Sequence, residues 1–237
     1  MKEICITLGG AVLRCHLRYD ETADYFGAFL CPLDPAAPLA EVTDLDWAFW
    51  ARNGAKPGPY LEYSSLTGSC SDQLLSMDRC AFHAVALAYR DRAWLIAAGS
   101  GVGKTTQLRT LQALCPGEIS VICGDRPILE LRSDGGVFVH PSPWNGKEAI
   151  GGAPGAPLAG IICLRRGASD LVETIPPRDA AIPVYQGIIQ TGETEEGIRR
   201  GAAFAEALID RVPVWRMVNR DVPGSTKLLM ERVLQGV

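Results

Sequence analysis

The feature that most constrains the fold of this chain is a glycine-rich octapeptide, AGSGVGKT, at residues 98–105. An apolar run, AWLIAA, precedes it, and TQLRTLQAL, which has the spacing of an amphipathic helix, follows it before Pro116 and Gly117. Other apolar strands and helical segments intermix along the rest of the chain. The pattern predicts an α/β fold, in which a mixed β-sheet with some antiparallel pairs is flanked by helices.

The octapeptide matches the phosphate-binding pattern G-x-x-x-x-G-K-[ST] at every fixed position except the first, where Ala98 replaces glycine. Glycines let several backbone N–H groups point into one concavity, and the following helix adds the positive end of its dipole. We expect Lys104 to reach the β- and γ-phosphates of a nucleotide and the Thr105 hydroxyl to bind Mg²⁺. The residues predicted to bind the nucleotide are Gly99, Ser100, Gly101, Val102, Gly103, Lys104, Thr105 and Thr106. The alternative is a glycine-rich turn followed by an unrelated helix.

A phosphate-binding loop requires a nearby carboxylate that binds the metal ion or acts as a base, and Asp125 is the best candidate. It ends the apolar strand ISVIC, and one helix separates that strand from Lys104, so the two strands are expected to lie close together in the sheet. His83 begins FHAVALAY, the strand before the loop strand. The alternatives are a turn-forming aspartate at Gly124-Asp125 and a histidine that packs in the core.

Charged and aromatic residues also gather in the segment HPSPWNGKE, directly after a predicted strand. It contains His140, Trp144, Asn145, Lys147 and Glu148, which is an unusual composition for a simple connection. The segment is therefore a candidate part of the site. A solvated loop with one anchored tryptophan explains the same sequence.

Composition excludes several classes of protein. The chain has 47% hydrophobic and 21% charged residues, which is typical of a globular protein. Its net charge is −4 and it has no basic cluster, so no nucleic-acid partner is expected. No apolar stretch is long enough for a membrane span, and neither the three histidines nor the eight cysteines have the spacing of zinc ligands. The scattered cysteines, without a secretory signal, predict a cytoplasmic protein.

The first part of the chain differs from the rest. EICITL and AVLRCHLRY alternate apolar and polar residues on either side of Gly9-Gly10, which predicts a strand pair. Residues 31–60 contain five prolines and the aromatic cluster WAFW, and are expected to be irregular: a loop-rich edge, a lid or a partner surface. We therefore divide the chain into a β-rich N-terminal segment at 1–75, packed on the core, and a nucleotide-binding domain at 76–237.

Together, FHAVALAYRDRAWLIAAGSGVGKTT and the later ISVICGDRP resemble the HPr kinase/phosphorylase-related family. The wider relatives of that family include ATP-dependent phosphoenolpyruvate carboxykinases and kinases of peptide natural-product precursors. PLAGIICLRRGASDLVETIPPRDA and VPVWRMVNRD are similar to its later strands. The resemblance covers about residues 76–237 and implies a phosphate-binding-loop fold of the carboxykinase and HPr kinase type. Assemblies are common in the family, so it also implies a homo-oligomer.

The resemblance further implies a kinase that uses ATP and Mg²⁺ and moves a γ-phosphoryl group onto a hydroxyl, often that of serine. Lys104 would hold the phosphates, and Thr105 would hold the Mg²⁺. Asp125 would be the catalytic carboxylate and a second metal ligand. His83 would lie near the acceptor or the γ-phosphate.

One departure from the family concerns the catalytic carboxylate. Many relatives have two consecutive aspartates at the end of this strand, but here Gly124 precedes Asp125. Either Asp125 is both base and metal ligand, or Glu148 or His83 supplies the base. Lys147 and Glu148 lie where relatives contribute residues that bind acceptor or phosphate. Phosphoryl transfer depends mainly on positioning and charge neutralisation, so the loss of one carboxylate need not abolish activity.

Three functions are open from the sequence. The first is an ATP-dependent kinase of a protein, peptide or small-molecule hydroxyl. The second is a metabolic enzyme closer to the carboxykinases, for which the chain lacks a cluster of basic residues. The third is a nucleotide-binding partner or scaffold without turnover, which Gly124 favours.

Overall fold

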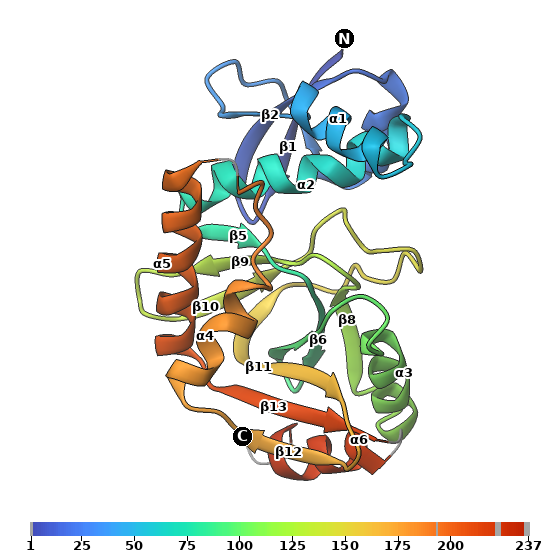
Figure 1. Ribbon diagram of the computed structural model, residues 1–237, viewed down its shortest axis with the longest axis vertical. Helices are drawn as coiled ribbons and strands as arrows, with labels where there is room; N and C mark the ends of the chain where they lie inside the picture. Colours follow the sequence, from blue (N-terminus) through green and yellow to red (C-terminus); the bar gives the residue numbers. More distant parts are fainter. Residues whose placement is uncertain (1, 193, 221–223, 235–237) are drawn as a thin grey trace.

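The computed structural model describes residues 2–192, 194–220 and 224–234. A small sheet with the strand order β3-β1-β2-β4 lies at one end of the molecule (Figure 1). Its strands are β1 (Lys2–Leu8), β2 (Ala11–Leu17), β3 (Leu30–Cys31) and β4 (Leu39–Glu41), and helices α1 (Asp44–Arg52) and α2 (Pro59–Leu75) follow. The predicted pair of strands around Gly9-Gly10 is confirmed as the antiparallel hairpin β1–β2. Helix α2 lies between this sheet and the rest of the molecule.

The prediction that residues 31–60 are irregular is wrong for much of the segment, because it contains β4, α1 and the first two residues of α2. A capping box starts α1: the Thr43 side chain accepts a hydrogen bond from the Asp46 N–H, and the Asp46 carboxylate accepts one from the Thr43 N–H. Pro59 stands in the first turn of α2, where it costs no helical hydrogen bond. Both signals are present in the sequence, and the high proline content of the segment obscures them.

In the described part of the chain, the second sheet has nine strands, with the order β5-β9-β10-β11-β7-β6-β8 and with β13 and β12 continuing beside β11. Its strands are β5 (Arg79–Ala81), β6 (Ala84–Tyr89), β7 (Arg92–Ala97), β8 (Ile119–Cys123), β9 (Ile128–Leu131), β10 (Val137–His140), β11 (Ala156–Arg166), β12 (Leu171–Thr174) and β13 (Val214–Asn219). The helices are α3 (Lys104–Leu114), α4 (Pro177–Tyr185), α5 (Glu195–Arg211) and α6 (Gly224–Leu229), which a π-helical turn, Met230–Leu234, extends. Parallel and antiparallel pairs are mixed, as the sequence predicts.

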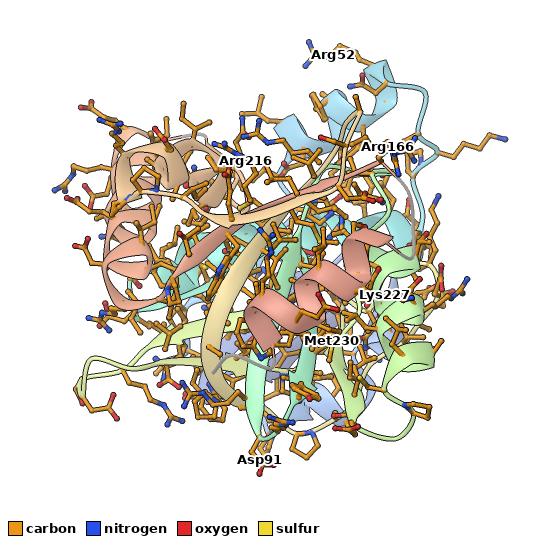
Figure 2. All side chains as sticks on the ribbon, turned by 90° about the horizontal axis from the view of Figure 1, so that it is seen from below. Arg52, Asp91, Arg166, Arg216, Lys227 and Met230 are labelled. Atoms are coloured by element: carbon orange, nitrogen blue, oxygen red, sulfur yellow. The ribbon has the colours of Figure 1, made fainter. Side chains whose placement is uncertain are left out.

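Helices cover both faces of the large sheet, so the sheet separates two apolar cores. Ala84 and Ala86 of β6 pack in the core that includes α4 and α5, whereas Val85 and Leu87 pack in the core that includes α3 and α6. This alternation follows from the two-residue period of a strand. Figure 1 shows α4 and α5 on one side of the molecule and α3 on the other, and Figure 2 looks onto α6.

The order of three strands brings the predicted site residues together. β6 runs antiparallel to both of its neighbours, β7 and β8. The two strands that were expected to lie close together therefore have one strand between them. Because β6 is reversed, its first residue lies at the same edge as the last residues of β7 and β8. His83, the glycine-rich loop and Asp125 consequently share that edge of the sheet.

No helix in the described part of the chain is long and apolar enough to span a membrane. All eight cysteines lie in the described ranges and are free thiols, seven of them buried.

Glu62 is a buried carboxylate, 1% exposed, that fastens α2 to the segment after β2. Its oxygens accept hydrogen bonds from the N–H groups of Arg18 and Tyr19 at 2.6 and 3.1 Å, and from the Thr22 hydroxyl at 2.6 Å. We expect Glu62→Gln to lower the free energy of unfolding by about 1–3 kcal/mol, because an amide NH₂ cannot accept these bonds. Urea unfolding followed by circular dichroism measures the change, with the exposed Glu21→Gln as control. Equal midpoints for the two variants would contradict this role.

Candidate functional site

The glycine-rich loop connects β7 to α3 and ends at the helix N-terminus. Gly101 and Gly103 have φ angles of +74° and +121°, and outside the adjoining backbone no heavy atom of the described residues lies within 4 Å of the point where either would carry a Cβ. Gly103 is the N-cap of α3, so no cap side chain accepts a hydrogen bond from the first N–H groups of the helix. These N–H groups and the helix dipole together favour an anion at this point.

Lys104, His83 and Asp125 meet beside this loop. The Lys104 Nζ atom donates a hydrogen bond to the Ala98 carbonyl oxygen at 2.9 Å and lies 3.0 Å from His83 Nε2. The same His83 nitrogen lies 3.4 Å from Asp125 Oδ1. Nε2 accepts from Lys104 when it is unprotonated and donates to Asp125 when it is protonated, so it serves one partner at a time. His83 thus links the cation of the loop to the carboxylate.

The local charges determine the ionisation of these groups. Burial raises the pKa of Asp125, but the hydrogen bond from His83 and the charges of Arg126, His83 and Lys104 outweigh it, and the pKa lies below its ordinary value. Burial lowers the pKa of Lys104, and the Asp125 charge offsets this only in part. At neutral pH the site therefore holds an ionised carboxylate beside a lysine whose charge is partly desolvated.

Arg126, which the sequence analysis does not select, connects Asp125 to α2. Its Nε atom lies 3.3 Å from Asp125 Oδ2. Its Nη1 atom donates to the Ser64 carbonyl oxygen at 2.8 Å and to the Thr67 hydroxyl at 2.6 Å. Its position directly after Asp125 is the only sequence signal for this role. Both oxygens of the Asp125 carboxylate are thus next to a basic side chain.

Arg166 is a second residue that the sequence analysis does not select. It ends β11, which pairs in parallel with β7, so it lies at the same edge of the sheet as the loop (Figure 2). Its Nη2 atom donates to the Gly101 carbonyl oxygen at 2.8 Å, and its Nε atom donates to the Val102 carbonyl oxygen at 3.3 Å. These bonds join the end of β11 to the loop, and Arg166 itself lines the cavity beside it. A basic residue at a strand end, in CLRR, is the available signal.

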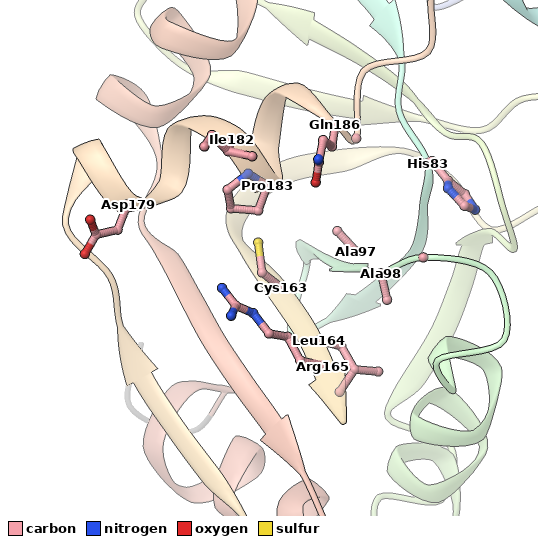
Figure 3. A pocket seen from close by; sticks show the side chains of 12 residues that line it. His83, Ala97, Ala98, Cys163, Leu164, Arg165, Asp179, Ile182, Pro183 and Gln186 are labelled. Carbon is pink, nitrogen blue, oxygen red and sulfur yellow. The ribbon is translucent and has the colours of Figure 1, made fainter. Parts of the chain in front are cut away.

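A cavity of about 700 Å³, which we call the loop cavity, contains most of the predicted site residues. Those that line it are His83, Ser100, Gly101, Gly103, Lys104, Thr105, Thr106, Asp125, Lys147 and Glu148. Gly99 and Val102 do not line it: Gly99 lines a neighbouring cavity of about 430 Å³, and Val102 packs against the core under α3. This neighbouring cavity, the α4 cavity, lies under α4 and also contacts His83 (Figure 3).

The segment HPSPWNGKE divides into an anchored part and an exposed part. Trp144 is buried and its ring N–H donates to the Tyr63 carbonyl oxygen at 2.8 Å, while Asn145 Oδ1 accepts from the Gly124 N–H at 3.2 Å. His140 lies outside the loop cavity and pairs with Glu130 at 2.8 Å. The anchored residues therefore fix the loop against the end of β8.

Lys147 and Glu148 form the exposed part of the same segment. Both line the loop cavity. The Glu148 carboxylate forms an ion pair with Arg109 of α3. Glu148 therefore closes the rim of the cavity against α3, and its role as a base stays a prediction.

Gly124 precedes Asp125 at the end of β8, and the structure leaves no room for a side chain there. A Cβ atom on Gly124 would lie 2.6 Å from the Ile150 carbonyl oxygen and 2.7 Å from the Asn145 carbonyl oxygen. Backbone atoms cannot move aside as a flexible side chain can. The loop after β10 thus packs directly on the end of β8, and this packing requires glycine.

Comparison with known proteins finds similarity to solved structures. No family model matches the chain, and no curated protein matches it. Among solved structures, it is similar to the Hpr(Ser) kinase/phosphatase from Coxiella burnetii, with a TM-score of 0.36 and 14% sequence identity over 66% of this chain and 88% of that chain.

The packing around Gly124 can be tested by adding one methyl group. We expect Gly124→Ala to destabilise the protein by about 1–3 kcal/mol, because the methyl group meets two backbone carbonyls. Gly58→Ala is the matched control, since Gly58 has an extended φ of 169° and open space around its Cβ position. Thermal unfolding measures both variants. A Gly124→Ala protein as stable as the Gly58→Ala protein would show that the loop yields to the added carbon.

Proposed function

We propose that this chain is an ATP-dependent kinase that transfers a γ-phosphoryl group to a hydroxyl. One observation carries the proposal: Lys104, His83 and Asp125 meet at the uncapped N-terminus of α3, inside a single cavity of about 700 Å³. The distant similarity to a kinase/phosphatase is compatible with this function and adds no detail to it.

The loop and α3 would hold the phosphates of the nucleotide. Free N–H groups at the start of α3 are donors for phosphate oxygens, and the glycine conformations keep side chains out of their way. Lys104 would exchange its bond to the Ala98 carbonyl oxygen for a phosphate oxygen. The number of hydrogen bonds that Lys104 donates stays the same in this exchange, and its charge then lies between the loop and Asp125.

The residues present fit a Mg²⁺ ion that is shared with the nucleotide. Within the described ranges, no group of three or more His, Cys, Asp and Glu side chains could hold a metal ion by itself. Thr105 and Asp125 line the same cavity and offer one hydroxyl and one carboxylate. Mg²⁺ usually takes one or two protein carboxylates and completes its shell with water and phosphate oxygens. Bound there, it would neutralise phosphate charge.

Asp125 would act mainly by orienting the acceptor hydroxyl. Because its pKa is lowered, its carboxylate is ionised at neutral pH and is a weak base. Phosphoryl transfer through a loose transition state needs little basicity and depends on alignment and positive charge. Lys104 and Arg126 provide that charge on two sides of Asp125.

A nucleotide-binding partner without turnover is the second candidate function. The packing around Gly124 favours it, because the space for a second carboxylate is filled by backbone atoms. The pairing of both Asp125 oxygens with His83 and Arg126 favours it as well, because a metal ion would have to compete with these contacts. Both functions predict that the chain binds a nucleotide. The kinase alone transfers the γ-phosphoryl group.

Nucleotide binding depends on Lys104 in both functions. We expect Lys104→Ala to weaken the binding of a non-hydrolysable ATP analogue by about 10- to 100-fold, because a charged hydrogen bond to phosphate is lost. Isothermal titration with and without Mg²⁺ measures the dissociation constant. Lys227→Ala, an exposed lysine of α6 outside the loop cavity, is the control (Figure 2). Equal affinity of the two variants would mean that the loop does not bind phosphate.

Transfer depends on Asp125, which separates the kinase from the inactive partner. We expect Asp125→Asn to bind the ATP analogue while its transfer rate falls by about 10²- to 10⁴-fold, since the loop is intact and the carboxylate is lost. Steady-state transfer of labelled phosphate to serine peptides measures the rate. Asp91→Asn, an exposed residue in the β6–β7 turn with φ of 60°, is the matched control (Figure 2). Full transfer by Asp125→Asn would show that Asp125 is neither base nor metal ligand.

A further inference from the structure

A second cavity, of about 590 Å³, lies between α1, α2 and the segment 186–191 that follows α4. We call it the α1 cavity. It shares three lining residues with the loop cavity, namely Ser64, His83 and Arg126. Among the described residues, the α4 cavity shares only His83 with the loop cavity. The α1 cavity is therefore the more direct continuation of the candidate site, and it opens beside the two residues that flank Asp125.

The direction of phosphoryl transfer favours entry of the acceptor through the α1 cavity. The proposed phosphate positions run from the N-terminus of α3 past Lys104 toward Asp125. In-line transfer requires the acceptor hydroxyl to arrive on the side of the γ-phosphate opposite the leaving nucleotide. His83 and Arg126 contact the two oxygens of Asp125, and these two side chains also line the α1 cavity.

Helix α1 gives this cavity an apolar wall. Leu45 and Phe49 are 69% and 54% exposed, and both line the cavity together with Trp50. The rings of Phe49 and Trp50 meet edge to face, with centroids 5.2 Å apart. The wall is fixed in place, because the capping box starts the helix and Trp47 is buried beneath Arg18. Exposed aromatic residues on a rigid helix are typical of a recognition surface.

The opposite side of the cavity is polar and offers no free cation. Ser64, Thr67 and Gln190 contribute to it. Arg126 is the only lysine or arginine among the described lining residues, and its guanidinium already contacts Ser64, Thr67 and Asp125. A small anionic metabolite would find no unpaired positive charge here. A neutral chain with an apolar side chain fits both walls.

We propose that the α1 cavity is the acceptor subsite, and that the acceptor is a serine or threonine in a peptide next to a large apolar or aromatic side chain. The hydroxyl residue would pass His83 and Arg126 toward Asp125, and its apolar neighbour would cover Phe49 and Trp50. This inference rests on the proposed kinase function and adds to it the class of acceptor and the residues that select it.

The test uses the full chain with ATP, Mg²⁺ and a set of peptides, Gly-Gly-X-Ser-Z-Gly-Gly, in which X or Z is varied. We expect phosphate incorporation to be at least about tenfold faster when Phe, Trp, Leu or Met adjoins the serine than when Gly, Asp or Lys does. The affinity for the ATP analogue is measured in parallel on the same protein.

Variants of Phe49 then locate the selectivity. We expect Phe49→Ala to raise the KM for the best peptide by about tenfold without changing the dissociation constant of the ATP analogue. Phe49→Glu is expected to shift the preference toward peptides with Lys beside the serine, which a loss of structure could not produce. Leu33→Ala, which removes an exposed apolar side chain outside the described cavities, is the matched control.

Four results would overturn the acceptor subsite, and one of them would also overturn the proposed kinase function. Equal rates for all peptides, or a wild-type preference in Phe49→Glu, would overturn the acceptor subsite. A protein that binds the ATP analogue through Lys104 but phosphorylates no peptide of the set also overturns it, and leaves nucleotide binding in place. If the protein does not bind the ATP analogue, both the proposed function and the acceptor subsite are wrong.

Discussion

The candidate site depends on one carboxylate that two basic side chains contact from opposite sides. His83 lies at one oxygen of Asp125 and Arg126 at the other. Arg126 also contacts Ser64 and Thr67 of α2, so a helix outside the glycine-rich loop helps to fix where the carboxylate points. The small sheet is thereby connected, through α2, to the candidate site at the edge of the large sheet.

Local patterns made much of the fold and part of the site predictable. The loop, its preceding strand and its following helix are contiguous in sequence, and Asp125 ends an apolar strand. The meeting of His83 with Lys104 could not be derived in this way, because it depends on β6 lying reversed between β7 and β8. Arg166 was missed for the same reason: it reaches the loop only because β11 pairs with β7. Local sequence patterns predict individual strands and helices. The order of strands in the sheet determines which strand ends, and which side chains at those ends, lie together.

The secondary structure before residue 76 was less predictable, because contacts with distant residues stabilise its helices. The spacing of apolar residues in α2 is weak, and several of its buried positions are polar, including Glu62, Thr67 and Ser71. Glu62 is satisfied by residues after β2, and the Ser71 hydroxyl accepts a hydrogen bond from the Ala81 N–H. A helix that buries polar side chains in such bonds lacks a clear amphipathic pattern. The sequence of α2 alone therefore does not predict a helix, because the groups that its polar side chains contact are distant in sequence.

Gly124 connects the proposed transfer with the proposed acceptor subsite through the packing of one loop. The backbone of the loop after β10 fills the space beside Gly124, and the same loop is anchored through Trp144 to Tyr63 of α2. The glycine at this position allows a direct contact between β8, the loop and α2. If transfer occurs, its alignment must therefore come from α2 and its neighbours rather than from a pair of aspartates. The walls that α1 and α2 give to the adjoining cavity are then the structures that position the acceptor.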